Sequence, residues 1–134
     1  MYACASTLQV AKQAELVKQT FEAQRAMMYK VSKASKPTPI EFQEVIKETS
    51  ELVTQVMACT TTDRRAPDYN HRQAMSEAIP AIGWVGVEKT PGPHVNDMWD
   101  CGAFNQTKIL TEYRGANEDQ VRATRRHHAA VPGE

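Results

Sequence analysis

The sequence predicts an all-α protein, an antiparallel helical bundle formed by a single domain. Apolar residues recur at the three-, four- and seven-residue spacings of a helix over most of the chain. No segment shows the strict alternation of apolar and polar residues that is expected of a half-buried strand. Stretches with proline and glycine separate the periodic segments, and 134 residues suit one domain. We therefore expect up to four helices joined by mostly short connections.

The first predicted helix runs from Ser6 to about Lys33. Its apolar stripe consists of Val10, Ala14, Val17, Phe21, Met28 and Val31. Gln24 occupies the one polar position within that stripe. Ser6 and Gln9 have the spacing of a capping box, in which each side chain bonds the backbone amide of the other residue. The methionine and aromatic side chains of this helix indicate either a core or a subunit interface.

The second predicted helix runs from about 39 to 59. Thr38, Pro39 and Glu41 provide a cap, a proline at the first helical position and an acid at the third. One face of the helix is apolar and consists of Phe42, Val45, Ile46, Leu52, Val53, Val56 and Met57. Residues 60–70 then contain almost no apolar residues and predict a loop.

A third, shorter helix follows, and Pro80 should end or kink it near Ile79. Its apolar side consists of Met75, Ala78, Ile79 and Ile82. Gly83 has the conformational freedom of a helix terminator, so we expect the chain to leave the helical conformation there.

The fourth predicted helix begins at Pro93 or His94 and ends near Arg114-Gly115. Its apolar face consists of Val95, Met98, Trp99, Gly102, Ile109, Leu110 and Tyr113. Cys101 is interpreted as a small residue within the helix packing. Residues 122–134 have no apolar stripe and end in basic residues, proline and glycine, which predicts a disordered basic tail. The helical domain therefore covers residues 1–121.

The composition excludes several classes of protein. The 16 basic and 16 acidic residues give a formal net charge of zero, which argues against nucleic-acid or membrane-surface binding driven by bulk charge. No apolar run approaches the roughly 20 residues of a membrane-spanning helix, and no secretory signal is visible. The three cysteines, Cys4, Cys59 and Cys101, are widely spaced and do not form a disulfide framework. These features predict reduced thiols and a cytoplasmic location.

Candidate chemistry is sparse. The histidines, His71, His94, His127 and His128, include no pair at the i, i+4 spacing of a helical metal site, so we expect no metal and no cofactor. No nucleophile motif, phosphate-binding glycine loop or Cys-His pair is present. Most carboxylates lie on the polar sides of predicted helices. The sequence therefore predicts a protein without enzymatic activity.

The segment 86–95, GVEKTPGPHV, stands out because Pro91, Gly92 and Pro93 are consecutive. The prolines fix φ and make the segment stiff. A stiff, exposed segment loses little entropy when a partner docks, which suits a recognition surface. Rigid turns also stabilise folds, so a purely structural role is the equal alternative.

Residues 82–113 have a pattern of GWV, a short spacer, PGP-x-V and a helix with an aspartate, a phenylalanine and a tyrosine near its end. The matching residues are Gly83, Trp84, Val85, Pro91, Gly92, Pro93, Val95, Met98, Asp100, Phe104 and Tyr113. Further matches upstream are Gln24-Arg25-Ala26, Lys33-Ala34-Ser35-Lys36-Pro37, Asn70-His71 and Ser76-Glu77. Together these motifs resemble the N-terminal helical folded domain of the cyclase-associated proteins, over roughly residues 6–121.

The resemblance implies an actin-regulatory module that dimerises, binds the pointed ends of cofilin-decorated actin filaments and promotes their depolymerisation. It implies no catalytic residue and no metal. It also implies that loops at one end of the bundle bind the filament, including the loop 60–70 and the loop with the two prolines. The candidate actin-binding residues are Arg64, Lys89, Pro91, Gly92, Pro93, Asn96 and Asp97.

The family domain has six helices, so we expect an incomplete version of that bundle here. Apolar stripes left uncovered would favour a homo-oligomer or a monomer of marginal stability. An alternative function is a helical interaction or oligomerisation scaffold that has no effect on filaments. The link of the family to adenylyl cyclase runs through a coiled coil that this sequence does not show.

Overall fold

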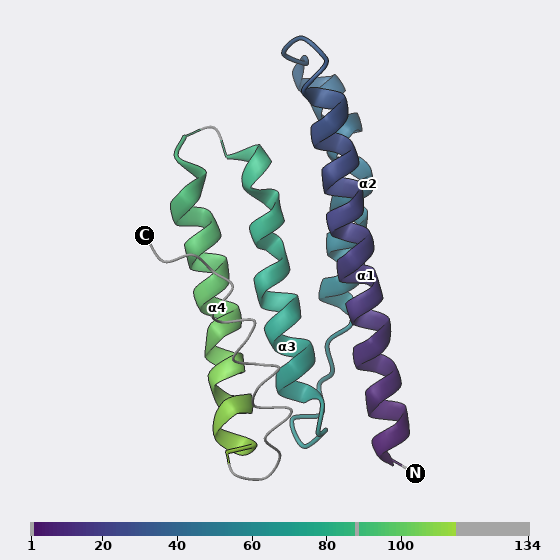
Figure 1. Ribbon diagram of the computed structural model, residues 1–134, viewed down its shortest axis with the longest axis vertical. Coiled ribbons are helices and arrows are strands. Elements are labelled where there is room, and N and C mark those ends of the chain that lie inside the picture. Colours follow the sequence, from purple (N-terminus) through teal and green to yellow (C-terminus); the bar gives the residue numbers. More distant parts are fainter. Residues whose placement is uncertain (1, 88, 115–134) are drawn as a thin grey trace.

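The computed structural model describes residues 2–87 and 89–114, with side chains from Leu8 onward. Its elements are α1 (Tyr2–Val31), α2 (Pro39–Ala58), α3 (Tyr69–Ala78), the 3₁₀-helix η1 (Ile79–Gly86) and α4 (Pro91–Glu112). These ranges contain no strand, and the prediction of an all-α fold is confirmed. The helices form two antiparallel hairpins that lie side by side, α1 with α2 and α3–η1 with α4 (Figure 1). The predicted tail, residues 122–134, lies outside the described residues.

The helix α1 differs from the prediction at its start and in its buried face. It begins at Tyr2, so Ser6 lies inside the helix and the predicted cap at Ser6 is wrong. The buried residues of α1 are Gln13, Thr20, Gln24 and Met27. Phe21 and Met28, which were predicted to share the apolar stripe, remain exposed. The buried face of α1 therefore contains more polar residues than the predicted apolar stripe.

The predicted start of α2 is confirmed. The backbone N–H of Thr38 donates to Glu41 Oε2 over 2.8 Å, and the N–H of Glu41 donates to Thr38 Oγ1 over 3.4 Å. The backbone N–H of Thr38 is the main cause that lowers the pKa of Glu41, and the Thr38 hydroxyl, which donates to Glu41 Oε2 over 2.8 Å, is the second. Pro39 follows at the first helical position, where its missing N–H has no helical partner to lose.

A small apolar core lies where the two hairpins meet. Val56 of α2 and Ile79 and Ile82 of η1 are buried in it. Further apolar side chains pack against this cluster, namely Leu16, Val17 and Val53. Because η1 contributes two of the three buried members, the segment around Pro80 is part of the core and not only a connection.

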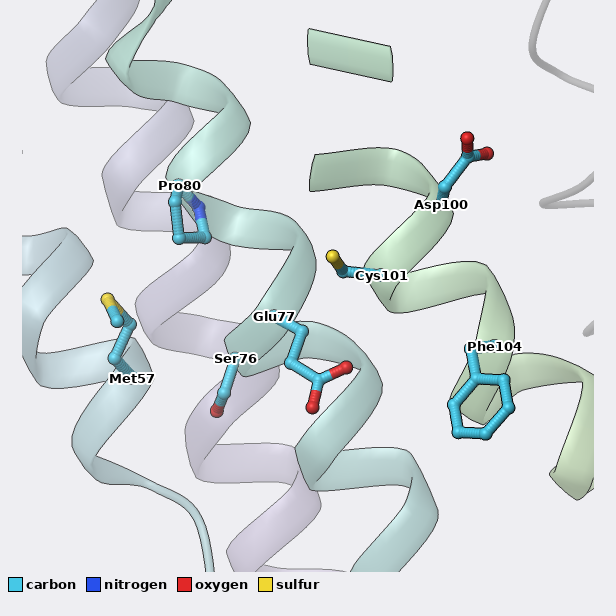
Figure 2. A pocket seen from close by; sticks show the side chains of 7 residues that line it. All are labelled: Met57, Ser76, Glu77, Pro80, Asp100, Cys101 and Phe104. Atoms are coloured by element: carbon cyan, nitrogen blue, oxygen red, sulfur yellow. The ribbon is translucent and has the colours of Figure 1, made fainter. Parts of the chain in front are cut away.

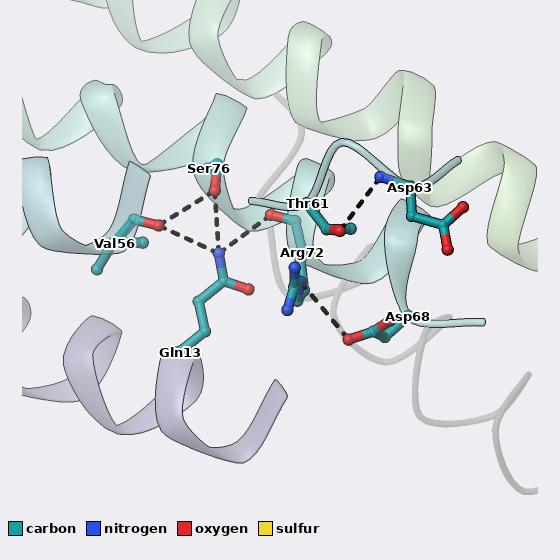
Figure 3. A network of polar contacts seen from close by, with 7 residues as sticks. All are labelled: Gln13, Val56, Thr61, Asp63, Asp68, Arg72 and Ser76. Atoms are coloured by element: carbon teal, nitrogen blue, oxygen red, sulfur yellow. Dashed lines mark hydrogen bonds and ion pairs between the residues drawn. The ribbon is translucent and has the colours of Figure 1, made fainter. Parts of the chain in front are cut away.

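A buried polar junction joins three helices next to this core. Gln13 of α1 is 1% exposed, and its Nε2 lies 3.0 Å from both Arg72 O and Ser76 Oγ. Ser76 Oγ in turn donates to Val56 O over 3.1 Å. Figure 3 shows the Gln13 amide between the end of α2 and the side of α3. The junction therefore fixes the start of α3 relative to the first hairpin.

The chain from α3 to η1 confirms one prediction and corrects another. The α-helix ends at Ala78, one residue before Ile79, as expected from Pro80. Gly83 does not end the helical conformation, because η1 continues through it to Gly86. The 3₁₀ geometry accepts the proline near its start, where fewer backbone donors are needed.

Helices α3 and α4 approach each other closely at Gly102. A Cβ atom built on Gly102 would lie 2.7 Å from Ala78 Cβ and 3.0 Å from Ala74 O. Only a residue without a side chain permits this contact. The small residues at the crossing thus set the spacing of the second hairpin.

Candidate partner-binding surface

The corner between η1 and α4 is built from the segment that the sequence singled out. Pro91, Gly92 and Pro93 form the first turn of α4, so the helix begins two residues before Pro93, the earlier of the two predicted starts. The prolines fit there because the first N–H groups of a helix have no internal acceptor. Thr90, just before the helix, has φ 43° and is the only non-glycine residue with positive φ among those described. The turn is therefore concentrated in one strained residue.

The start of α4 is held against η1 by His94. Its Nε2 lies 3.1 Å from the carbonyl oxygen of Pro80, which is a pure acceptor. The histidine therefore donates from Nε2. This hydrogen bond and the two prolines together restrict the conformation of the corner.

The polar side chains that the corner presents point to solvent without internal partners. Lys89, Asn96 and Asp97 are exposed. Within the ranges 8–87 and 89–114, no carboxylate lies within 4.0 Å of Lys89 and no cation lies within 4.0 Å of Asp97. Gly92 and Pro93 are also exposed, whereas Pro91 is half-buried. An incoming partner would meet these groups without first breaking an internal ion pair.

Arg64 lies at the opposite end of the second hairpin. The ten residues of α3 and the eight of the 3₁₀-helix η1 separate its loop from the corner by about 31 Å along the helices. Figure 1 shows the loop 59–68 beside the C-terminal end of α4 and the corner at the other end. The expectation that the two loops share one end of the bundle is therefore wrong. The antiparallel course of α3 and α4 requires this separation.

The Arg64 loop has an ordered backbone. Asp63 Oδ1 accepts the backbone N–H of Arg65 over 2.9 Å, and Thr61 Oγ1 accepts the N–H of Asp63 over 3.3 Å. Arg64 and Arg65 are exposed, and none of the described carboxylates lies within 4.0 Å of either side chain. The loop therefore presents two cations on a fixed turn.

Ionisable groups connect this loop to the helices. Asp68, which precedes α3, lies 3.5 Å from Arg72 Nε, and both side chains are largely buried (Figure 3). The rings of His71 and Tyr113 meet edge to face with their centres 5.9 Å apart. Burial lowers the pKa of His71, although Glu112 and Asp68 oppose the shift. This end of the hairpin thus contains a histidine that the fold prefers in its neutral form.

The connection between α1 and α2 lies at the same end of the molecule as the corner between η1 and α4 and projects beyond it (Figure 1). Lys33 contacts the hydroxyl of Tyr29 and lies 4.0 Å from the centre of its ring. Lys36 is exposed as well. The sequence motif Lys33–Pro37 was noticed, but sequence reasoning missed that it shares an end with the corner. Only the course of the first hairpin reveals this.

The described residues form neither a metal-binding cluster nor a membrane-spanning helix. None of their histidine, cysteine and acidic side chains gathers in a set of three or more that could hold a metal ion. None of the described helices is long and apolar enough to cross a membrane. Cys101 is exposed, so its predicted place within the helix packing is wrong. His127 and His128 lie outside the described residues.

Comparison with known proteins identifies relatives over most of the chain. A family model described as the N-terminal domain of CAP matches residues 3–130. The adenylyl cyclase-associated protein of Dictyostelium discoideum is 34% identical over 113 residues, which is 84% of this chain and 24% of the relative. The human adenylyl cyclase-associated protein 2 is 34% identical over 101 residues, 75% of this chain and 21% of the relative. The chain therefore spans about a quarter of the length of these relatives or less.

Two solved structures have the same fold. One, a crystal structure of the N-terminal domain of CAP described as indicating variable oligomerisation, is 31% identical with a TM-score of 0.82, over 94% of this chain and 69% of its own. The other, the N-terminal domain of the adenylyl cyclase-associated protein from Dictyostelium discoideum, is 34% identical with a TM-score of 0.78, over 84% of this chain and 64% of its own. The helical hairpins described above are thus a shared architecture. This chain belongs to the cyclase-associated protein family, through the N-terminal domain of CAP.

Proposed function

We propose that this protein is a non-catalytic regulator of the actin cytoskeleton in the cytoplasm. The observation that supports it most is the membership of the CAP family, together with the corner between η1 and α4. There, Lys89, which has no ion-pair partner among the described residues, lies beside a helix start that two prolines and His94 restrict. A preorganised corner with an exposed lysine suits a partner that brings an acidic side chain to it, because little entropy is lost on docking.

In the proposed activity, the protein binds the pointed end of a cofilin-decorated actin filament and promotes loss of terminal subunits. Lys89 makes a charge contact with acidic actin side chains, and Asn96 and Asp97 provide polar contacts. Pro91, Gly92 and Pro93 hold the corner in shape. Arg64 contributes from the other end of the hairpin, so it contacts a different actin or cofilin surface from the one that Lys89 meets.

Pointed-end shortening of cofilin-decorated filaments tests this proposal directly. Added protein should accelerate shortening, and Lys89→Ala should weaken the effect because it removes an unpaired cation at the contact. Lys18→Ala is the matched control, since Lys18 is an exposed lysine on the side of α1 and far along the chain from the corner. If the folded wild-type protein leaves the shortening rate unchanged, the proposal is wrong.

A second candidate function is that of an oligomerisation scaffold without filament activity. Several large apolar side chains on α1 and α2 are exposed, including Phe21 at 58%, Tyr29 at 63% and Ile40 at 77%. Exposed apolar surface of this kind favours self-association into a homo-oligomer. Sedimentation velocity at increasing protein concentration tests it, and a monomer at every concentration would exclude it.

A further inference from the structure

A groove open to solvent runs between α2, α3–η1 and α4, away from the corner and from the Arg64 loop. We call it the α2–α4 groove and define it by Met57, Glu77, Pro80, Asp100, Cys101 and Phe104. Figure 2 shows Met57 on one side, Cys101 and Phe104 on the other, and Glu77 and Pro80 between them. Its two largest apolar side chains are exposed to solvent, Met57 to 45% and Phe104 to 64%. An apolar surface between three helical elements is suited to receive a further helix.

The carboxylate of Glu77 is held in a fixed orientation inside this groove. Its Oε1 accepts a hydrogen bond from Gln73 Nε2 over 2.8 Å, and its Oε2 accepts one from Asn105 Nδ2 over 2.6 Å. Both donors are neutral amides, and no cation lies within 4.0 Å of Glu77 in the part of the chain that the structure describes. A half-buried carboxylate with free lone pairs gains most from an arginine brought by a partner.

The remaining charges give the groove an acidic and a basic end. Asp100 is exposed, and Asp97 lies about one turn further toward the start of α4; neither has a cation within 4.0 Å among the described side chains. On the other side of Phe104, Lys108 Nζ lies 4.2 Å from the ring centre. Asp97 and Asp100 therefore lie on the side of Phe104 that is closer to the corner, and Lys108 lies on the other side. Glu77 is bonded to Asn105 between them.

We propose that the α2–α4 groove binds an amphipathic helix of a partner protein, with apolar side chains on one face and arginines or lysines beside them. Its apolar face covers Met57, Pro80 and Phe104. A basic residue pairs with the Glu77 carboxylate, and a second one meets Asp100. The fixed carboxylate supplies the specificity, and the adaptable Met57 side chain adjusts to the apolar residue that enters.

Two labelled amphipathic peptides of equal length test the proposal. They share one apolar face of leucine and methionine, and the flanking positions are arginine in one and glutamate in the other. We expect the arginine peptide to bind the full chain about tenfold more tightly in fluorescence anisotropy, because only it forms charge-assisted bonds with the groove. The difference should shrink as sodium chloride is added.

Variants locate the binding. Phe104→Ser should weaken binding of the arginine peptide about tenfold by removing apolar contact. Asp100→Asn and Glu77→Gln should reduce the preference for arginine over glutamate, and Asp100→Asn does so without touching any internal hydrogen bond. Tyr29→Ser, at an exposed aromatic residue of α1, is the control that should leave binding unchanged.

Several results would overturn the proposal. Equal binding of both peptides, no binding of either, or a loss with Tyr29→Ser as large as with Phe104→Ser would each do so. Self-association that Phe104→Ser abolishes, in a protein that binds neither peptide, would assign the groove to a second copy of this chain. None of these measurements uses actin, so they test the groove independently of the proposed filament activity.

Discussion

The two ends of the α3–η1 and α4 hairpin both present unpaired cations, but they are ordered by different forces. The corner at Lys89 is shaped mainly by two prolines that fix φ and by a strained Thr90, and one hydrogen bond from His94 adds to them. The loop at Arg64 is shaped by polar and charged side chains, namely Asp63, Asp68 and His71, and burial lowers the pKa of His71. Covalent restriction is insensitive to pH, whereas a polar network is not. The corner is thus the more robust of the two surfaces.

The largest effect should follow from breaking the junction that fixes the loop end. Gln13→Ala removes the amide bonded to Arg72 O and Ser76 Oγ and leaves a cavity at a fully buried site. We expect the free energy of unfolding to fall by about 3 kcal/mol. Urea denaturation measures this fall, and Gln19→Ala, at an exposed residue bonded only to Glu15, is the control. A loss similar to that of the control would show that the junction stabilises little.

Separating the two helices of the hairpin should affect both ends together. Gly102→Ala places a methyl group 2.7 Å from Ala78 Cβ and 3.0 Å from a backbone oxygen, so α3 and α4 must move apart. The expected destabilisation is about 1–3 kcal/mol, measured by thermal unfolding. Gly92→Ala, where the added atom meets nothing within 4 Å, is the matched control and should be neutral or slightly stabilising. Equal melting temperatures for the two variants would contradict the close approach.

Acid should distinguish the loop end from the corner. The pKa of His71 is lowered from 6.5 mainly by burial, so the unfolded chain binds this proton more readily than the folded one. The stabilisation is therefore complete above pH 6.5 and is lost as the pH falls from there through the folded-state pKa. His71→Phe should flatten this part of the pH profile of unfolding free energy, measured by denaturation between pH 7.5 and pH 5.5. An unchanged slope in the variant would assign the pH dependence to other groups.

The smallest effect concerns the strain at the corner. Thr90→Gly relieves a β-branched residue of positive φ and also makes the unfolded chain more flexible, so the two contributions nearly cancel. We expect a net change within about 1 kcal/mol. Hydrogen exchange of the amides at the start of α4 should nevertheless become faster, because glycine allows other conformations. Unchanged exchange would mean that the prolines and His94 alone hold the corner.

Most helices could be predicted because their signals are local. Thr38, Pro39 and Glu41 start α2 through bonds within one turn, and Pro80 ends α3 through its own ring. The buried face of α1 could not be predicted in the same way. Gln13 and Gln24 are buried while Phe21 is exposed, which depends on where α2 and α3 lie.

The candidate site was predicted in part. The exposure of Lys89, Asn96 and Asp97 agrees with a binding surface, and their role in binding actin stays a prediction. The expectation that the Arg64 loop lies at the same end of the bundle as the corner was wrong, because sequence distance does not give the direction in which α3 runs. The α2–α4 groove could not be predicted from the sequence either, because Met57, Glu77 and Phe104 come from three separate elements.

The sequence by itself determined the helical class, the start of α2, the break at Pro80 and the family, because each depends on residues that are close along the chain or on a motif read in order. The tertiary structure decided which faces are buried, which loops share an end, and where an acidic groove opens beside wet apolar side chains. Those properties arise from packing between distant segments, where a glycine at position 102 and a glutamine at position 13 set the spacing that no local pattern specifies.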